Sequence, residues 1–247
     1  MKRWHLFAFG LGIYLLALVV TAPATWADAM LQNVSGGRLQ LADARGSLWS
    51  GSAQLLIRDA AGRIGVATPL AWRLRPATLL RARLAYAVDL GAPSRSFPVT
   101  LSWSRIELAH VDIVLPAVTL GYVAPKLASL ELSGEVHLQI QDLVIGRHSL
   151  RGDATLQWLH AGSALSPVSP LGNYQLRLVG AGDGGRVTLT TLKGPLQLRG
   201  QGSWAEGGAP AFAVNATVPA EYRQRLEPFL RLIAVKQVDG SFAMQLQ

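Results

Sequence analysis

The chain has 247 residues, which is long enough for one large β domain or two smaller domains with their own cores. Half of the residues are hydrophobic and 15% are charged, which excludes an intrinsically disordered chain. There is no cysteine, which excludes disulfides, thiolate zinc sites and cysteine nucleophiles. The net charge is +8, but the arginines are scattered singly along the chain, whereas nucleic-acid-binding proteins cluster basic residues. We therefore expect a solvated arginine-rich face, with a surface facing anionic lipid headgroups as the alternative.

An uncharged apolar segment follows Lys2 and Arg3. It runs from Leu6 to Trp26, which matches the ~20 residues that a bilayer core requires. The sequence therefore predicts a cytoplasmic tail at residues 1–5, a transmembrane anchor at residues 6–26 and an exported body at residues 27–247. A cleaved signal peptide is the alternative, because Ala27-Asp28-Ala29 resembles a small-residue cleavage site.

The body shows the period-two alternation of half-buried strands. Val136, Leu138 and Ile140, for example, alternate with polar residues. Glycine-containing turn sequences at 59–62, 181–185 and 206–210 separate such runs and predict hairpins. We expect a mostly β body of about a dozen strands in a curved, largely antiparallel sheet.

Two segments depart from this alternation. Residues 115–130 predict a short helix or loop broken at Pro125, where the body divides softly into two β halves. Residues 219–235 have apolar side chains at helical spacing. Pro228 interrupts that spacing and predicts a kink or two short helices.

No catalytic constellation is visible in the sequence. Residues 180–185 match a dinucleotide-binding glycine pattern, but an alternating strand follows them instead of the required helix, so they predict a hairpin turn. The five histidines lack the spacing of a zinc site, and the serines lack a nucleophile elbow. We expect a protein that is not an enzyme and has no catalytic, cofactor-binding or metal residues and no small-molecule substrate.

One region carries a family resemblance. The segment from Arg45 to Ala53, followed by residues 70–76, resembles the N protein of the bacterial type II secretion system. The matching residues are Gly46, Ser47, Trp49, Gly51, Trp72 and Pro76. A tryptophan between glycines is expected to pack on the core while the glycines let the backbone turn around it. The motif residues are therefore expected to be structural.

The resemblance implies an accessory component of the inner membrane of a Gram-negative bacterium. It would be a single-pass protein with its body in the periplasm, and would take part in the export of folded proteins across the outer membrane. Its partners would be other type II secretion components and the inner membrane, without nucleic acid. The resemblance extends more broadly to AsmA-like β-rich proteins, so lipid handling or outer-membrane homeostasis in the periplasm is the alternative.

Overall fold

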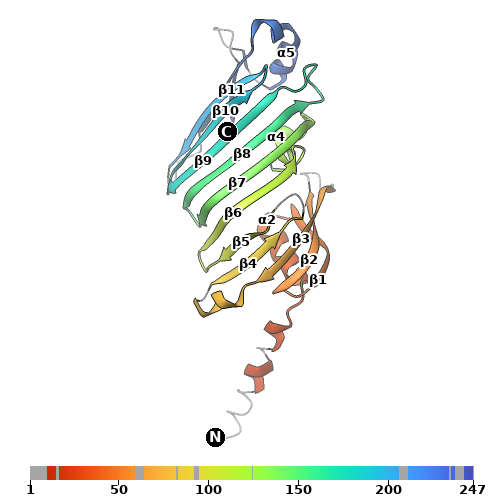
Figure 1. The fold of residues 1–247 in the computed structure, drawn as a ribbon, viewed down its shortest axis with the longest axis vertical. Helices are drawn as coiled ribbons and strands as arrows, with labels where there is room; N and C mark the ends of the chain where they lie inside the picture. Colours follow the sequence, from red (N-terminus) through yellow and green to blue (C-terminus); the bar gives the residue numbers. More distant parts are fainter. Residues whose placement is uncertain are drawn as a thin grey trace.

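The computed structural model describes residues 10–14, 17–58, 64–81, 83–91, 95–123, 125–205, 211–233, 235–236 and 242–246. These residues form one long β-sheet, and the N-terminal segment projects from one end of it (Figure 1).

The strands are separated by short connections along most of the chain. They are β1 (Leu39–Gly46), β2 (Ser50–Arg58), β3 (Ile64–Leu74), β4 (Leu84–Asp89), β5 (Phe97–Leu101), β6 (Arg105–Pro116), β7 (Leu132–Gly146), β8 (Leu150–Ser163), β9 (Gly172–Gly182), β10 (Gly185–Lys193), β11 (Gln197–Trp204), β12 (Ala211–Thr217), β13 (Val235–Lys236) and β14 (Phe242–Leu246). The helical elements are α2 (Thr25–Ser35), the 3-10 helix η1 (Pro76–Arg81), α3 (Thr119–Val123), α4 (Pro125–Ala128) and α5 (Ala220–Ile233). The prediction of a mostly β body is confirmed, and its helices are few, although the described residues form more of them than the one or two short helices expected.

The sheet is an antiparallel meander. Strands β1 to β12 lie in chain order, followed by β14 and then β13, which gives 14 strands within the described residues. The hairpin predicted at residues 181–185 is present, because the Ala181 amide donates to the Gly184 carbonyl at 2.8 Å. The predicted turns at 59–62 and 206–210 lie outside the described residues.

One face of this sheet is apolar and the other is polar, as the alternation predicts. Leu138 of β7 is paired with Leu156 of β8, which is paired with Leu176 of β9. The neighbouring positions Gln157 and Gln175 are paired in the same way on the opposite face. Because residues paired across antiparallel strands share a face, the leucines form a continuous apolar ladder.

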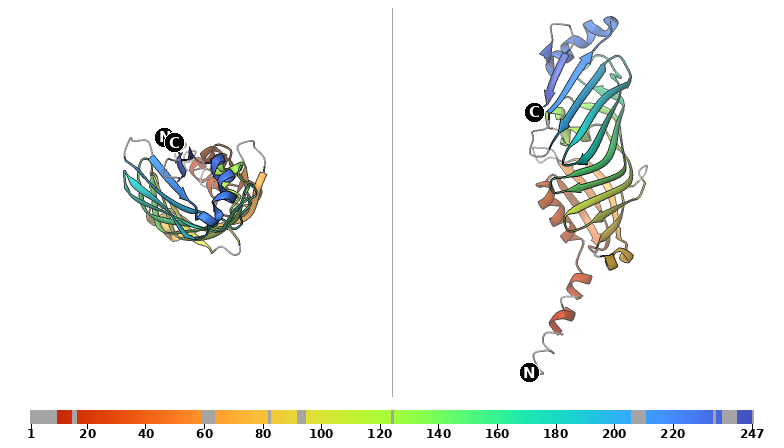
Figure 2. Two further views of the ribbon diagram at one scale, coloured as in Figure 1. Left: turned by 90° about the horizontal axis from the view of Figure 1, so that it is seen from above. Right: turned by 90° about the vertical axis from the view of Figure 1, so that its left-hand side faces the viewer.

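The sheet is curved like a gutter, and helices α2, α4 and α5 lie on its inner side (Figure 2). Helix α5 packs against the sheet through Leu226, Phe229 and Leu230, which contact the cluster that includes Leu196 and Ala216. Because Ala216 belongs to the apolar face, this face is the concave one. The hydrophobic effect thus explains both the position of the helices and the alternation in the strands.

The segment between β6 and β7 is helical, as predicted, and forms α3 and α4 on the two sides of residue 124. It joins two strands that are paired from Arg105↔Gly146 to Pro116↔Glu135, so the sheet continues across the division expected at residues 115–130. Whether the body divides softly there stays a prediction.

The C-terminal helical segment is one helix. Residues Ala220–Ile233 form α5, and Pro228 lies inside it, so the alternative of two separate short helices is wrong. A proline in a helix interior removes one backbone hydrogen bond, and burial of Leu226 and Leu230 offsets this loss.

The N-terminal segment is helical at residues 10–14 and 17–20 and turns at residues 21–24 before α2 begins. Ala22 and Ala24 are buried, and Ala24 belongs to the cluster that α2 forms with β1 to β3. Among the described residues, no helix combines the length and the apolar character needed to cross a membrane. The anchor expected at residues 6–26 falls partly on residues outside the described ranges and stays a prediction.

Candidate functional site

The motif glycines and serine build a tight turn between β1 and β2. Gly46 has a φ of +95°, and a Cβ there would lie 2.5 Å from the Ser50 carbonyl oxygen. The Ser47 hydroxyl accepts hydrogen bonds from the Trp49 and Ser50 amides at 3.3 and 3.2 Å. The turn therefore requires glycine at position 46 for its conformation and serine at position 47 for its hydrogen bonds.

Trp72 lies beneath this turn. Its side chain is buried, and its indole Nε1 donates to the Ser47 and Leu48 carbonyls at 3.2 and 3.1 Å. A Cβ at Gly51 would lie 2.5 Å from an atom of the Trp72 ring, so only glycine leaves room for the ring. Trp72 is thus the indole that packs on the core while its polar end satisfies the turn.

Trp49 has a different position from the expected one. It is half-buried, and its Nε1 donates to the Val19 carbonyl at 2.9 Å. The adjacent Leu48 amide donates to the Ala22 carbonyl at 2.8 Å. The expectation that the Trp49 ring fills the core is wrong, because the turn directs Trp49 toward the N-terminal segment and leaves the core position to Trp72.

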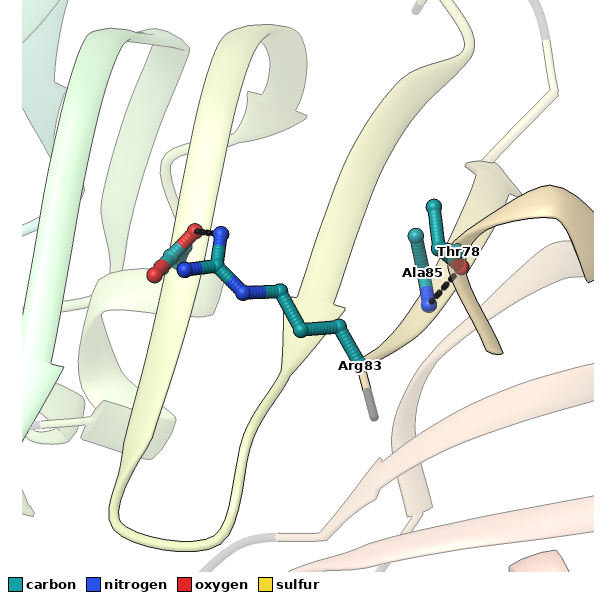
Figure 3. Close-up of polar contacts among 4 residues, drawn as sticks. Thr78, Arg83 and Ala85 are labelled. Atoms are coloured by element: carbon teal, nitrogen blue, oxygen red, sulfur yellow. Dashed lines mark hydrogen bonds and ion pairs between the residues drawn. The ribbon is translucent and has the colours of Figure 1, made fainter. Parts of the chain in front are cut away.

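The last motif residue, Pro76, begins η1, which connects β3 with β4. The Arg75 amide donates to the Ala85 carbonyl at 2.7 Å, and the Thr78 hydroxyl accepts from the Ala85 amide at 3.3 Å. Arg83 follows η1, and its guanidinium lies 3.9 Å from the Glu107 carboxylate (Figure 3). These contacts hold η1 beside the start of β4 and connect Arg83 with β6.

The β1–β2, β3–β4 and β5–β6 connections lie at the same ends of the strands, along one side of the sheet. Every second connection of an antiparallel meander returns to that side. The described residues of these three connections are 47–49, 75–81 with 83, and 102–104, and we call them the tryptophan edge. Trp103, at the tip of the β5–β6 turn, is 98% exposed, and Leu79 in η1 is 45% exposed. The sequence analysis missed Trp103, although a tryptophan in the turn sequence Ser102-Trp103-Ser104 was a readable signal.

The centre of the concave face has a separate character. Its buried cluster consists of Phe97, Val111, Ile113, Ile140 and Leu143, and all of its members come from strands. No residue of the described helices belongs to this cluster or is packed against it. Helices therefore cover the two ends of the concave face, while strand side chains alone form its central cluster.

The described side chains hold no group of three or more acidic, histidine or cysteine residues placed to bind a metal ion. Among the described residues, the largest pKa shift is at Tyr174, where burial raises the pKa of the phenol. Its hydroxyl donates to the Leu196 carbonyl at 3.0 Å, and its ring packs against Trp158 with centroids 5.8 Å apart. Tyr174 thus contributes to packing beneath α5.

Comparison with known proteins gave one family. The sequence model of the family described as type II secretion system (T2SS), protein N, matches residues 37–245. The chain belongs to this family. The match begins just before β1 and ends within β14, so it covers almost the entire sheet. The resemblance inferred from the motif is confirmed, and family membership connects the chain with type II secretion and with other components of that system.

Comparison with curated proteins gave no match, and comparison with solved structures gave none either.

Proposed function

We propose that this protein is an accessory inner-membrane component of the type II secretion system, which takes part in the export of folded proteins through protein–protein contacts. The observation that carries the proposal is the family match across the sheet, from residue 37 to residue 245. The protein acts in this proposal without chemistry of its own, as a scaffold rather than an enzyme.

The open sheet suits a scaffold. Its outer strands, β1 at one end and β13 at the other, each have one strand neighbour in the described sheet. The main-chain groups of an edge strand can pair with a strand of another protein, which requires no particular side chains. On β1, the Leu39 and Leu41 amides already donate to the Ser35 and Asp28 side chains of α2. The edge at β13 is therefore the candidate site for a periplasmic domain of another secretion component.

The proposal places residues 1–5 in the cytoplasm, the anchor expected at residues 6–26 in the inner membrane and the body in the periplasm, with the chain leaving the bilayer before Ala22, which is buried against the body. The exposed apolar residues of the N-terminal segment support this arrangement, since Leu11, Ile13 and Tyr14 are each more than half exposed. Exposed apolar side chains in a row are stabilised by transfer into lipid. A C-terminal alkaline phosphatase fusion, which is active only after export, tests the arrangement, and an inactive fusion would contradict it.

Secretion itself is tested with a strain that lacks the gene. We expect type II exoproteins to accumulate in the periplasm and to return to the medium when the gene is restored. A strain lacking the secretin provides the positive control, and a secreted protein of another pathway provides the specificity control. Normal secretion of every type II exoprotein would contradict the proposed role.

A second candidate function is favoured by the concave face. Its apolar ladder, together with the central cluster that no described helix joins, fits the alternative of an AsmA-like lipid-handling protein. Acyl chains are bound by continuous apolar surfaces of this kind.

The matched variants Leu156→Gln and Thr155→Gln distinguish the two functions, because these neighbours lie on opposite faces of β8. If lipid lies on the concave face, a photoactivatable phospholipid will cross-link several-fold less to Leu156→Gln and equally well to Thr155→Gln. Absence of cross-linking to the unmodified protein would remove the lipid function and leave the scaffold.

A further inference from the structure

We infer that the tryptophan edge is a membrane-contact surface that rests on the headgroup layer of an anionic phospholipid bilayer. The inference rests on the proposed attachment of the N-terminal segment to the membrane and assigns a second contact to the body itself.

The composition of the edge points to lipid. Trp103 is 98% exposed at the tip of its turn, and Leu79 is exposed in η1. Exposed arginines accompany them at positions 75, 83 and 105, and none of the residues of the three connections is acidic. Indole rings prefer the interfacial layer of a bilayer, and guanidinium groups bind phosphate oxygens. A surface with both groups fits a layer of anionic headgroups.

The position of the edge agrees with its composition. Adjacent strands lie about 4.8 Å apart, so the three connections span on the order of 20 Å along the sheet. Trp49, in the first connection, holds the N-terminal segment through its bond to the Val19 carbonyl. Figures 1 and 2 show η1 at the same end of the body from which this segment projects. A bilayer that receives the segment therefore lies next to the tryptophan edge.

The opposite edge of the same strands carries both signs of charge, because Arg58 ends β2 there and Arg95 lies just before β5, whereas the tryptophan edge has no acidic residue in its connections. The acidic residues of the opposite edge are Asp89 at the end of β4, Glu131 before β7 and Glu135 near the beginning of β7. These carboxylates would be repelled by anionic headgroups. The difference between the two edges orients the first six strands toward the membrane with the tryptophan edge nearer to it.

Site-directed spin labelling tests the contact, because the chain contains no cysteine and a single introduced cysteine takes the label. The variants are Trp103→Cys on the tryptophan edge and Leu165→Cys as the matched control, since Leu165 is 45% exposed in the β8–β9 connection at the opposite edge. The full chain is reconstituted into nanodiscs of phosphatidylcholine with or without phosphatidylglycerol. Collisions of the label with oxygen, which partitions into lipid, are compared with those with water-soluble, neutral nickel ethylenediaminediacetate.

In discs with phosphatidylglycerol, we expect the label at position 103 to collide several-fold less with the nickel complex and more with oxygen. The label at position 165 stays accessible to the nickel complex. Adding Arg75→Gln and Arg105→Gln to Trp103→Cys restores access, because the phosphate contacts are lost.

Three results would overturn the inference. If protein that has entered the discs shows equal nickel access at positions 103 and 165, the proposed contact of the tryptophan edge is wrong. The proposed N-terminal attachment would still stand. If the protein stays outside the discs, both the edge contact and the N-terminal attachment are wrong. Protection of position 103 that appears only when other secretion components are added assigns the edge to a protein partner instead.

Discussion

A helix covers each end of the concave face, but the two helices are held by different kinds of contact. At the C-terminal end, α5 is held mainly by burial, with Leu226 and Leu230 fully enclosed, and the exposed Arg225 guanidinium also donates to the Pro167 carbonyl at 3.1 Å. At the N-terminal end, α2 packs on smaller residues and is also tied by the Asp28 carboxylate, which accepts a hydrogen bond from the Leu41 amide at 2.7 Å. Burial is non-directional, whereas hydrogen bonds fix position. The hydrogen bond between Asp28 and Leu41 therefore fixes the position of α2, and with it the direction in which the N-terminal segment leaves the sheet.

The largest expected effect concerns the buried indole of the N-terminal end. Trp72→Ala should lower the free energy of unfolding by about 4 kcal/mol, because it leaves a cavity and removes the donor to the turn. The matched variant Trp49→Ala should cost about 1 kcal/mol, since its ring is half-buried and makes one hydrogen bond to the N-terminal segment. Urea unfolding of the full chain in detergent, followed by circular dichroism, measures both. Equal losses would contradict the different placement of the two rings.

The next effect concerns the C-terminal end. Leu226→Ala should lower the free energy of unfolding by about 3 kcal/mol, because its side chain has no exposed surface and α5 depends on burial. Leu232→Ala provides the control on the same helix, since Leu232 is 68% exposed and its removal should change little. Hydrogen exchange of the α5 amides reports the loss directly. Unchanged protection in Leu226→Ala would show that α5 is held by contacts other than the buried leucines.

The smallest effect separates the two kinds of contact. Asp28→Ala should cost about 2 kcal/mol, because the carboxylate joins α2 to the Leu41 amide and also accepts from Gln32 at 2.8 Å. Glu221 occupies the corresponding first turn of α5, and Glu221→Ala should cost about 0.5 kcal/mol through the helix dipole alone. The same urea titration measures both variants. A loss for Glu221→Ala as large as for Asp28→Ala would remove the proposed distinction between the ends.

The sheet could be predicted from the sequence because apolar and polar side chains alternate along each strand and so fall on opposite faces. The alternation around Leu138 predicts the apolar ladder, and the glycines at 182, 184 and 185 predict the hairpin that joins β9 with β10. The degree of curvature and the open form of the sheet cannot be predicted from the alternation in single strands, since they depend on how all the strands twist together. The continuation of the sheet from β6 to β7 likewise depends on a pairing across 15 intervening residues, 117–131.

The motif residues could be named from the sequence, but the different positions of the two tryptophans could not be fully predicted. Trp72 lies within β3 and shares its alternation with Leu70 and Leu74, but Trp49 lies in the turn before β2, where no alternation shows which way its ring turns. The tight turn at Gly46 decides this, because it places Trp72 beneath the Ser47 and Leu48 carbonyls. A hydropathy pattern has the same limit at residues 22–35, where apolar side chains that pack on a sheet resemble those that enter a membrane.

The chain order of the strands has a consequence for how this protein acquires its fold. From β2 to β12, each strand pairs with the one that immediately precedes it, so most loops that must close are short. Short loops close at little entropic cost and favour rapid folding. A chain that emerges end first from a ribosome or a pore can therefore add one strand at a time to a growing edge, without waiting for its C-terminus.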